Sequence, residues 1–122
     1  SIRRRQRQMC IRDSLNDMKI NWVHEQEAMF LTSSLTTAGG ITFVGDLDRY
    51  FNAFDTKSGD LIWKTRLSSA LHGFPITYSI NNKQYVAVTT GMGVFRALTS
   101  LISPQIHQPD NGNAIYVFEL ES

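Results

Sequence analysis

The chain has little cysteine, little proline and no long hydrophobic run. Its 122 residues contain one cysteine, Cys10, and three prolines. A single cysteine cannot form an internal disulfide, and it excludes a metal site built from several cysteines. No run of about 18 apolar residues occurs, so no membrane span is expected, and the charged first residues lack the apolar segment of a signal peptide. The length suits one small domain or a piece of a larger one.

The charges are almost balanced, with 12 Lys and Arg against 11 Asp and Glu, but they are unevenly distributed. Residues 1–14 hold five arginines and a single aspartate. A basic arm of this kind could bind nucleic acid, but no aromatic residue is interleaved with the arginines. We therefore expect residues 1–14 to be a non-native or disordered extension with no nucleic-acid partner, and residues 15–122 to form the structured part.

Short apolar runs separated by turn residues make up the remaining sequence. No window keeps the i, i+3, i+4, i+7 spacing of an amphipathic helix. The runs are rich in Val, Ile, Thr, Tyr and Phe, and turn pairs such as Gly39-Gly40 and Ser58-Gly59 separate them. The pattern predicts an all-β chain. The expected strands are 20–25, 34–38, 41–45, 49–55, 61–67, 75–80, 84–90 and 114–120.

A repeat connects the two tryptophans. Ala53 to Trp63 reads Ala-x-Asp-x-x-Ser-Gly-x-x-x-Trp, and Trp22 lies 41 residues before Trp63. A period of about 40 to 50 residues is typical of four-stranded propeller blades. The strands then account for about two blades of a β-propeller: the outer strand of one blade, one full blade and three strands of the last. A propeller needs about four blades to close, so we expect the chain to be a fragment.

The motif from Ala53 to Trp63 resembles the tryptophan-docking motif of the eight-bladed quinoprotein alcohol dehydrogenases, which use pyrroloquinoline quinone (PQQ). The segments 35–40, 44–48, 74–77 and 83–88 are similar to the last blades of that family in the same order. The resemblance covers residues 18–122. It implies a C-terminal fragment of a PQQ-dependent alcohol dehydrogenase, an oxidoreductase of the periplasm that oxidises small alcohols.

The resemblance also implies cofactors and partners. In that family a Ca²⁺ or lanthanide ion polarises the quinone, an aspartate takes the alcohol proton, and electrons leave to a cytochrome c. The catalytic aspartate and the metal ligands lie in earlier blades. No catalytic or metal-binding residue is therefore expected in this chain, which is not catalytic alone, and the remaining blades of the parent chain are expected as its partners.

The candidate cofactor-binding residues follow from one loop. The family reads Gly-x-Gly-Gly-Trp where this chain has Gly91, Met92, Gly93, Val94 and Phe95. Gly91 and Gly93 match, whereas Val94 and Phe95 differ from the family, although Phe95 keeps an aromatic ring. In addition, some members have a tryptophan near the quinone at the position of Leu31. These departures leave open the alternative function, a non-enzymatic propeller scaffold for protein interactions.

Other polar and aromatic residues have simpler interpretations. Asp46 and Asp48 resemble a carboxylate pair for metal or acid–base chemistry, but a structural role in a turn is favoured. The three histidines are too far apart in sequence to predict a metal site. Only His72, in a connection expected on the same face as the Gly91 loop, is a candidate for a substrate funnel. Trp22 and Trp63 are expected to pack between blades.

Overall fold

A computed structural model describes residues 8–14, 19–26, 28–91, 96–107, 109 and 111–121. Strands dominate this part of the chain, so the all-β prediction is confirmed, and each of the eight predicted strands is present. The elements are β1 (Gln8–Ser14), β2 (Lys19–Gln26), β3 (Leu35–Thr36), β4 (Ile41–Gly45), β5 (Tyr50–Asp55), β6 (Leu61–Arg66), β7 (Ile76–Ile80), β8 (Lys83–Thr90), α1 (Arg96–Ile102) and β9 (Ala114–Leu120).

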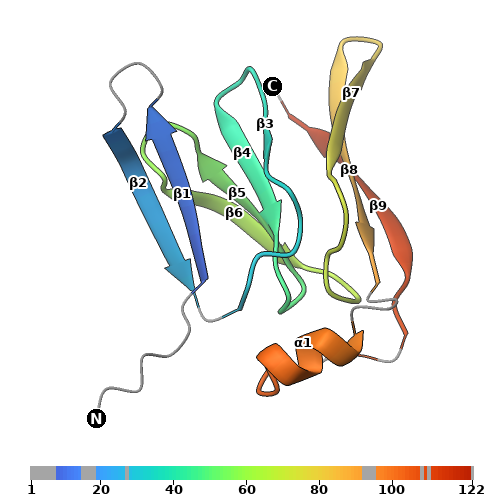
Figure 1. Ribbon diagram of the computed structural model, residues 1–122. Helices are drawn as coiled ribbons and strands as arrows, with labels where there is room; N and C mark the ends of the chain where they lie inside the picture. The colour runs from blue at the N-terminus through green and yellow to red at the C-terminus, as the bar shows by residue number, and fades with distance from the viewer. Residues whose placement is uncertain are drawn as a thin grey trace.

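The strands form three antiparallel sheets that stand side by side (Figure 1). The first sheet is β1-β2, the second is β3-β4-β5-β6 and the third is β7-β8-β9. Neighbouring strands in the second and third sheets are consecutive in the chain, as in the meander of a propeller blade. The four strands of the second sheet and the three strands of the third are the numbers expected for one full blade and the last blade.

Two elements differ from the sequence prediction. β1 lies within the expected extension, yet it pairs with β2 from Gln8 opposite Gln26 to Ser14 opposite Lys19. Pairing satisfies backbone groups that would otherwise remain open along the edge of β2, so residues 8–14 are not a disordered tail. Residues 1–7 lie outside the described residues, and a non-native origin of 1–14 stays a prediction.

The second difference is α1, whose seven residues are too short to give a periodic signal.

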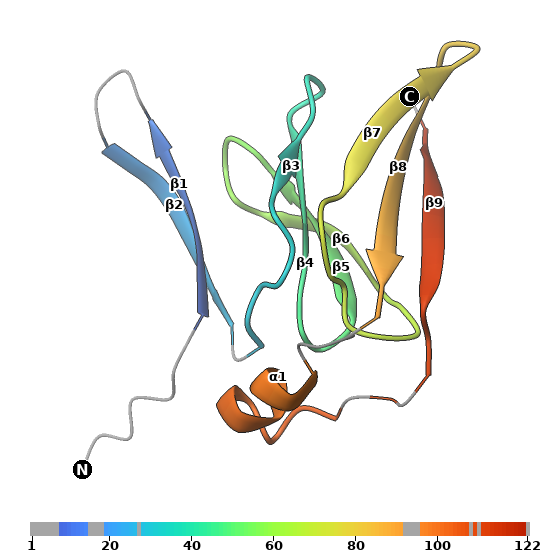
Figure 2. The same ribbon diagram turned by 45° about the vertical axis from the view of Figure 1, so that its right-hand side comes forward.

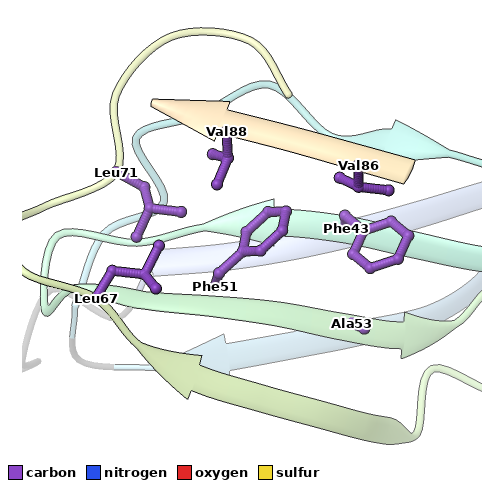
Figure 3. Packing of buried hydrophobic residues seen from close by; sticks show 7 residues of the cluster. All are labelled: Phe43, Phe51, Ala53, Leu67, Leu71, Val86 and Val88. Carbon is purple, nitrogen blue, oxygen red and sulfur yellow. The ribbon is translucent and has the colours of Figure 1, made fainter. Parts of the chain in front are cut away.

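The larger hydrophobic cluster fills the space between the second and third sheets (Figure 3). Phe43 and Phe51 of the second sheet stack with their ring centroids 5.6 Å apart. Val86 and Val88 alternate with more exposed residues along β8 and face the same space. The full cluster is Phe43, Phe51, Ala53, Leu67, Leu71, Val86 and Val88. It holds the two sheets face to face.

Trp22 joins the first sheet to the second. Its indole Nε1 donates a hydrogen bond to the carbonyl oxygen of Thr56 at 2.9 Å, and its ring lies 6.0 Å from Phe54. Gly59 has a φ of 78°, and a Cβ there would lie 2.6 Å from the indole ring. The indole therefore rests on the turn of the neighbouring sheet, as expected for a packing residue.

Trp63 occupies the equivalent place one sheet further along. Its ring lies 5.4 Å from Phe118 on β9, and Phe118 corresponds in the repeat to Phe54 on β5. It also makes an edge contact with Phe51 at 6.4 Å. Each tryptophan thus contacts the matching aromatic residue of the next sheet, so the 41-residue spacing reflects a repeated packing geometry.

The helix α1 lies at one end of the sheets (Figure 2). A smaller hydrophobic cluster is formed by residues of the connections. Ala28, Leu47 and Ala70 are buried there, and Met29, Leu31 and Ile106 pack against them. These residues come from connections rather than strands. Among the described residues, no helix has the length and apolar composition needed to cross a membrane.

Candidate functional site

The connections at the α1 end are joined to one another by backbone hydrogen bonds. The amide of Leu47 donates to the carbonyl of Met29 at 2.9 Å, and the amide of Gly91 donates to the carbonyl of Ala70 at 3.0 Å. A third bond, from the Leu71 amide to the Asp46 carbonyl, measures 3.4 Å. We call this end the loop face. It comprises residues 28–34, 46–49, 67–75, 91, 96–107, 109 and 111–113.

Gly91 is the candidate cofactor residue that the structure describes. It has a φ of 134°, a conformation that favours glycine, and a Cβ at this position would overlap the side chain of Asn113. The backbone at Gly91 therefore approaches Asn113 more closely than another residue would allow. Gly93, Val94 and Phe95 lie outside the described residues, and their cofactor role stays a prediction.

Two cavities identified among the described residues lie away from Gly91. Asn113 occupies the space beside Gly91. A cavity of about 350 Å³ lies between the first and second sheets, and another lies at the β7–β8 turn, but Gly91 lines neither of them. Binding of PQQ by this loop therefore still rests on the sequence resemblance.

Asp46 is a buried carboxylate held by three donors. It is 3% exposed, and it accepts hydrogen bonds from the Tyr50 amide at 3.0 Å, from Gln26 Nε2 at 3.1 Å and from Asn52 Nδ2 at 3.3 Å. Burial raises the pKa of Asp46 above its ordinary 3.8, and these hydrogen bonds oppose the shift only in part. The network joins the end of β2 to the β4–β5 turn.

Asp48 has a separate partner. Its carboxylate accepts from Arg66 at 2.9 Å, and both side chains are well exposed. Both aspartates line the cavity between the first and second sheets, but their hydrogen-bond partners differ, and the structural role favoured for them stays a prediction. No group of three or more His, Cys, Asp and Glu side chains within the described part of the chain could hold a metal ion.

Asp55, the aspartate of the repeat motif, caps the turn between β5 and β6. Its Oδ1 accepts hydrogen bonds from the amides of Lys57 at 2.8 Å and Ser58 at 2.9 Å. These bonds favour the ionised form, so the pKa of Asp55 is lowered, mainly by the Ser58 and Lys57 amides. The capped turn is the one on which Trp22 rests.

Asp46 and Asp55 should affect the pH dependence of folding stability in opposite directions. Because the folded state binds a proton at Asp46 more readily than the unfolded chain does, Asp46 should contribute more to stability as the pH falls. The melting temperature of the full-length parent should therefore rise relative to that of its Asp46→Asn variant as the pH falls from about 7 to about 4. Asp55 stabilises the fold above its unfolded pKa, so the advantage of the unmodified protein over Asp55→Asn should disappear below about pH 4. Identical pH profiles for the two variants would contradict these assignments.

The histidines lie in separate environments. His24 packs against Phe54 in the contact between the first two sheets, with the two ring centroids 4.8 Å apart. His72 lies on the loop face, where its amide donates to the carbonyl of Thr89 at 3.3 Å and its own carbonyl accepts from Thr89 Oγ1 at 2.7 Å. His107 is exposed after α1. The substrate-funnel role of His72 stays a prediction.

The sequence did not reveal a polar network on the loop face. The hydroxyls of Ser68 and Thr90 both donate to the carbonyl of Gly112, at 2.8 Å and 2.6 Å. Tyr116 of β9 joins this network through Ser68, whose amide donates to the Tyr116 hydroxyl at 3.3 Å and whose Oγ accepts from it at 2.9 Å. Ser68 and Tyr116 are 48 residues apart, so no local spacing pairs them. The only signal was the Asn111-Gly112 turn pair, which marked the entry to the last strand.

The three sheets are stacked, and Trp22 of the first and Trp63 of the second each rest on the next sheet. This arrangement defines a section of a β-propeller. Comparison with known proteins identifies which propeller this is. Residues 6–86 match the family model described as "PQQ: Glucose/ethanol/alcohol dehydrogenase, beta-propeller domain". The match covers more than half of the chain, so the chain belongs to the PQQ-dependent glucose, ethanol and alcohol dehydrogenase propeller family, and the sequence resemblance is confirmed.

Individual relatives agree with the family assignment. The quinoprotein ethanol dehydrogenase of Pseudomonas aeruginosa is 35% identical over 105 residues, which cover 85% of this chain and 17% of that protein. The lanthanide-dependent methanol dehydrogenase of Methylacidiphilum fumariolicum is 38% identical over 82 residues, which cover 66% of this chain and 13% of the relative. A solved europium-containing methanol dehydrogenase superposes with a TM-score of 0.75 at 28% identity, over 92% of this chain and 23% of the relative. The chain thus spans less than a quarter of the length of each of these proteins.

Proposed function

We propose that the full-length parent of this chain is a PQQ-dependent dehydrogenase that oxidises small alcohols. The observation that carries the proposal is the match of residues 6–86 to the dehydrogenase propeller family. Over the same residues, the Trp22 indole rests on the Asp55–Gly59 turn. The names of the similar proteins, ethanol and methanol dehydrogenases, support an alcohol as the substrate class.

The cofactors and the acceptor belong to the same proposal. PQQ supplies the oxidising chemistry when it is bound, and a Ca²⁺ or lanthanide ion accompanies it, with ligands supplied by parts of the parent outside this chain. A relative named "Methanol dehydrogenase [cytochrome c] subunit 1", from Paracoccus denitrificans, supports a cytochrome c as the electron acceptor. We further propose that the parent works in the periplasm.

The remaining blades of the parent are the proposed structural partners. The outer face of the third sheet exposes Ile76 (57%), Ile115 (73%) and Val117 (52%). Buried apolar area is the main favourable contribution to sheet packing. Another blade packed on this face would continue the stacking that the first three sheets show.

Within this chain we propose Gly91, Gly93, Val94 and Phe95 as the residues that border the quinone. The loop face supports the assignment, because the amide of Gly91 is fixed to Ala70 and the β6–β7 connection that holds His72 lies on the same face. The two glycines let the backbone approach a flat ligand, and Phe95 adds an aromatic edge.

Two substitutions in the full-length parent test this division of roles. Phe95→Ala should weaken quinone binding several-fold, since an aromatic contact contributes about 0.5 to 1.5 kcal/mol beyond burial. Trp63→Ala should instead lower folding stability, by less than the ~3 to 5 kcal/mol of a fully buried aromatic residue because Trp63 is 40% exposed, and leave the quinone affinity of the folded fraction unchanged. Quinone titration and thermal unfolding of both variants measure the two effects.

Either of two results would contradict the assignment. If Phe95→Ala binds quinone like the parent, the loop does not border the cofactor. If Trp63→Ala loses quinone affinity while its melting temperature is normal, the tryptophan is a site residue and not a packing residue. A parent that binds no quinone at all would support the scaffold alternative, which the family departures at Val94, Phe95 and Leu31 leave open.

A further inference from the structure

Both ends of the long β8–β9 connection are bound to one short segment, the start of the β6–β7 connection. At the near end, the Gly91 amide donates to the carbonyl of Ala70 at 3.0 Å. At the far end, Ser68 Oγ donates to the carbonyl of Gly112 at 2.8 Å. Residues 68–70 therefore fix the points where the connection leaves β8 and returns toward β9.

Tyr116 holds the far end in place. Its hydroxyl donates to Ser68 Oγ at 2.9 Å and accepts from the Ser68 amide at 3.3 Å. Thr90 Oγ1 donates to the same Gly112 carbonyl at 2.6 Å. Gly112 has a φ of 127°, and a Cβ there would lie 2.8 Å from the Ser68 carbonyl oxygen. The close approach of the two segments thus requires glycine at this position.

The middle of the connection contacts the loop face in part. Ile106 packs against the small cluster of Ala28, Leu47 and Ala70, and Ser103 is 6% exposed. In α1, by contrast, Leu98 is 50% exposed and Leu101 is 82% exposed. We therefore expect the fixed ends of the connection to contribute to the position of the exposed helix.

We propose that Ser68 and Tyr116 form a positioning clamp that holds residues 96–107 on the loop face and thereby sets the access of an alcohol substrate to that face. The part concerning substrate rests on the proposed function, whereas the clamp itself does not. Ser68 and Tyr116 are positioning residues: Ser68 binds the carbonyl of Gly112, and Tyr116 holds the Ser68 hydroxyl in place.

The test uses the full-length parent and the variants Tyr116→Phe, Ser68→Ala and Ser68→Thr. Tyr85→Phe is the matched control, since Tyr85 stacks on Tyr78 at 5.5 Å and pairs with Glu119 away from the clamp. Hydrogen exchange of the amides in residues 96–107 is the first readout, and it needs no quinone. The KM and kcat for a short alcohol are the second.

Tyr116→Phe and Ser68→Ala should each accelerate exchange in residues 96–107 by about three- to tenfold, the range expected for loss of one hydrogen bond. Because both residues belong to one network, the double variant should exchange little faster than either single variant. Ser68→Thr keeps a hydroxyl and should restore protection, and Tyr85→Phe should exchange like the parent. In the enzyme assay, KM should rise while kcat stays nearly constant.

Unchanged exchange in Tyr116→Phe and Ser68→Ala would overturn the clamp, as would equal acceleration by Tyr85→Phe. Accelerated exchange with an unaltered KM would overturn the role in substrate access. A parent without quinone-dependent activity would refute the proposed function, and the exchange result would still decide whether the clamp exists.

Discussion

Phe51→Ala should lower the free energy of unfolding by about 3 to 5 kcal/mol, the cost of truncating a fully buried phenylalanine. Phe51 has no exposed surface. Its ring contacts Phe43 at 5.6 Å, Phe118 at 5.8 Å and Trp63 at 6.4 Å. The substitution removes a central side chain of the contact between the second and third sheets, and it leaves a cavity that the surroundings fill only in part.

Thermal unfolding of the full-length parent measures this effect, with Phe51→Leu as the control. Leucine keeps most of the apolar volume and should cost less than about 1.5 kcal/mol. Similar melting temperatures for Phe51→Ala and Phe51→Leu would show that the sheets are not held together through this ring.

Gly59→Ala should destabilise the protein far more than Gly40→Ala, although both glycines have a left-handed backbone. Their φ values are 78° and 83°, and forcing an L side chain into this region costs about 1 to 2 kcal/mol at either position. A Cβ at Gly40 meets nothing within 4 Å, whereas a Cβ at Gly59 lies 2.6 Å from the indole of Trp22. The additional loss of stability in Gly59→Ala, compared with Gly40→Ala, therefore measures how closely Trp22 packs on the turn.

A double-mutant cycle isolates this contact. In a Trp22→Ala background the two glycine substitutions should have nearly equal effects on the melting temperature, because the clashing ring is absent. If Gly59→Ala still costs more than Gly40→Ala in that background, the turn is constrained by something other than the tryptophan.

The sequence was most informative where a regular period repeats. Alternating apolar residues and turn pairs located the eight predicted strands, and the 41-residue spacing of Trp22 and Trp63 predicted that both would pack on neighbouring sheets. These features are local, or they recur at a fixed interval, so a single chain contains enough information to find them.

Features that depend on distant residues were missed. β1 is stabilised by its pairing with β2, and its arginine-rich surroundings gave no strand signal. α1 is too short for its periodicity to be recognised. The network of Ser68, Tyr116 and Gly112 joins residues more than 40 positions apart, and only the folded arrangement of the loop face shows that they meet.

Reconstitution of the full-length parent with PQQ and either Ca²⁺ or a lanthanide tests whether the parent is a quinone-dependent alcohol dehydrogenase. We expect stoichiometric quinone binding and reduction of an artificial electron acceptor that depends on added primary alcohol. We also expect that this chain alone, which contains only part of the propeller, shows neither. A correctly folded parent that binds no quinone and oxidises no alcohol with either metal would refute the proposed function and support a scaffold role for the propeller.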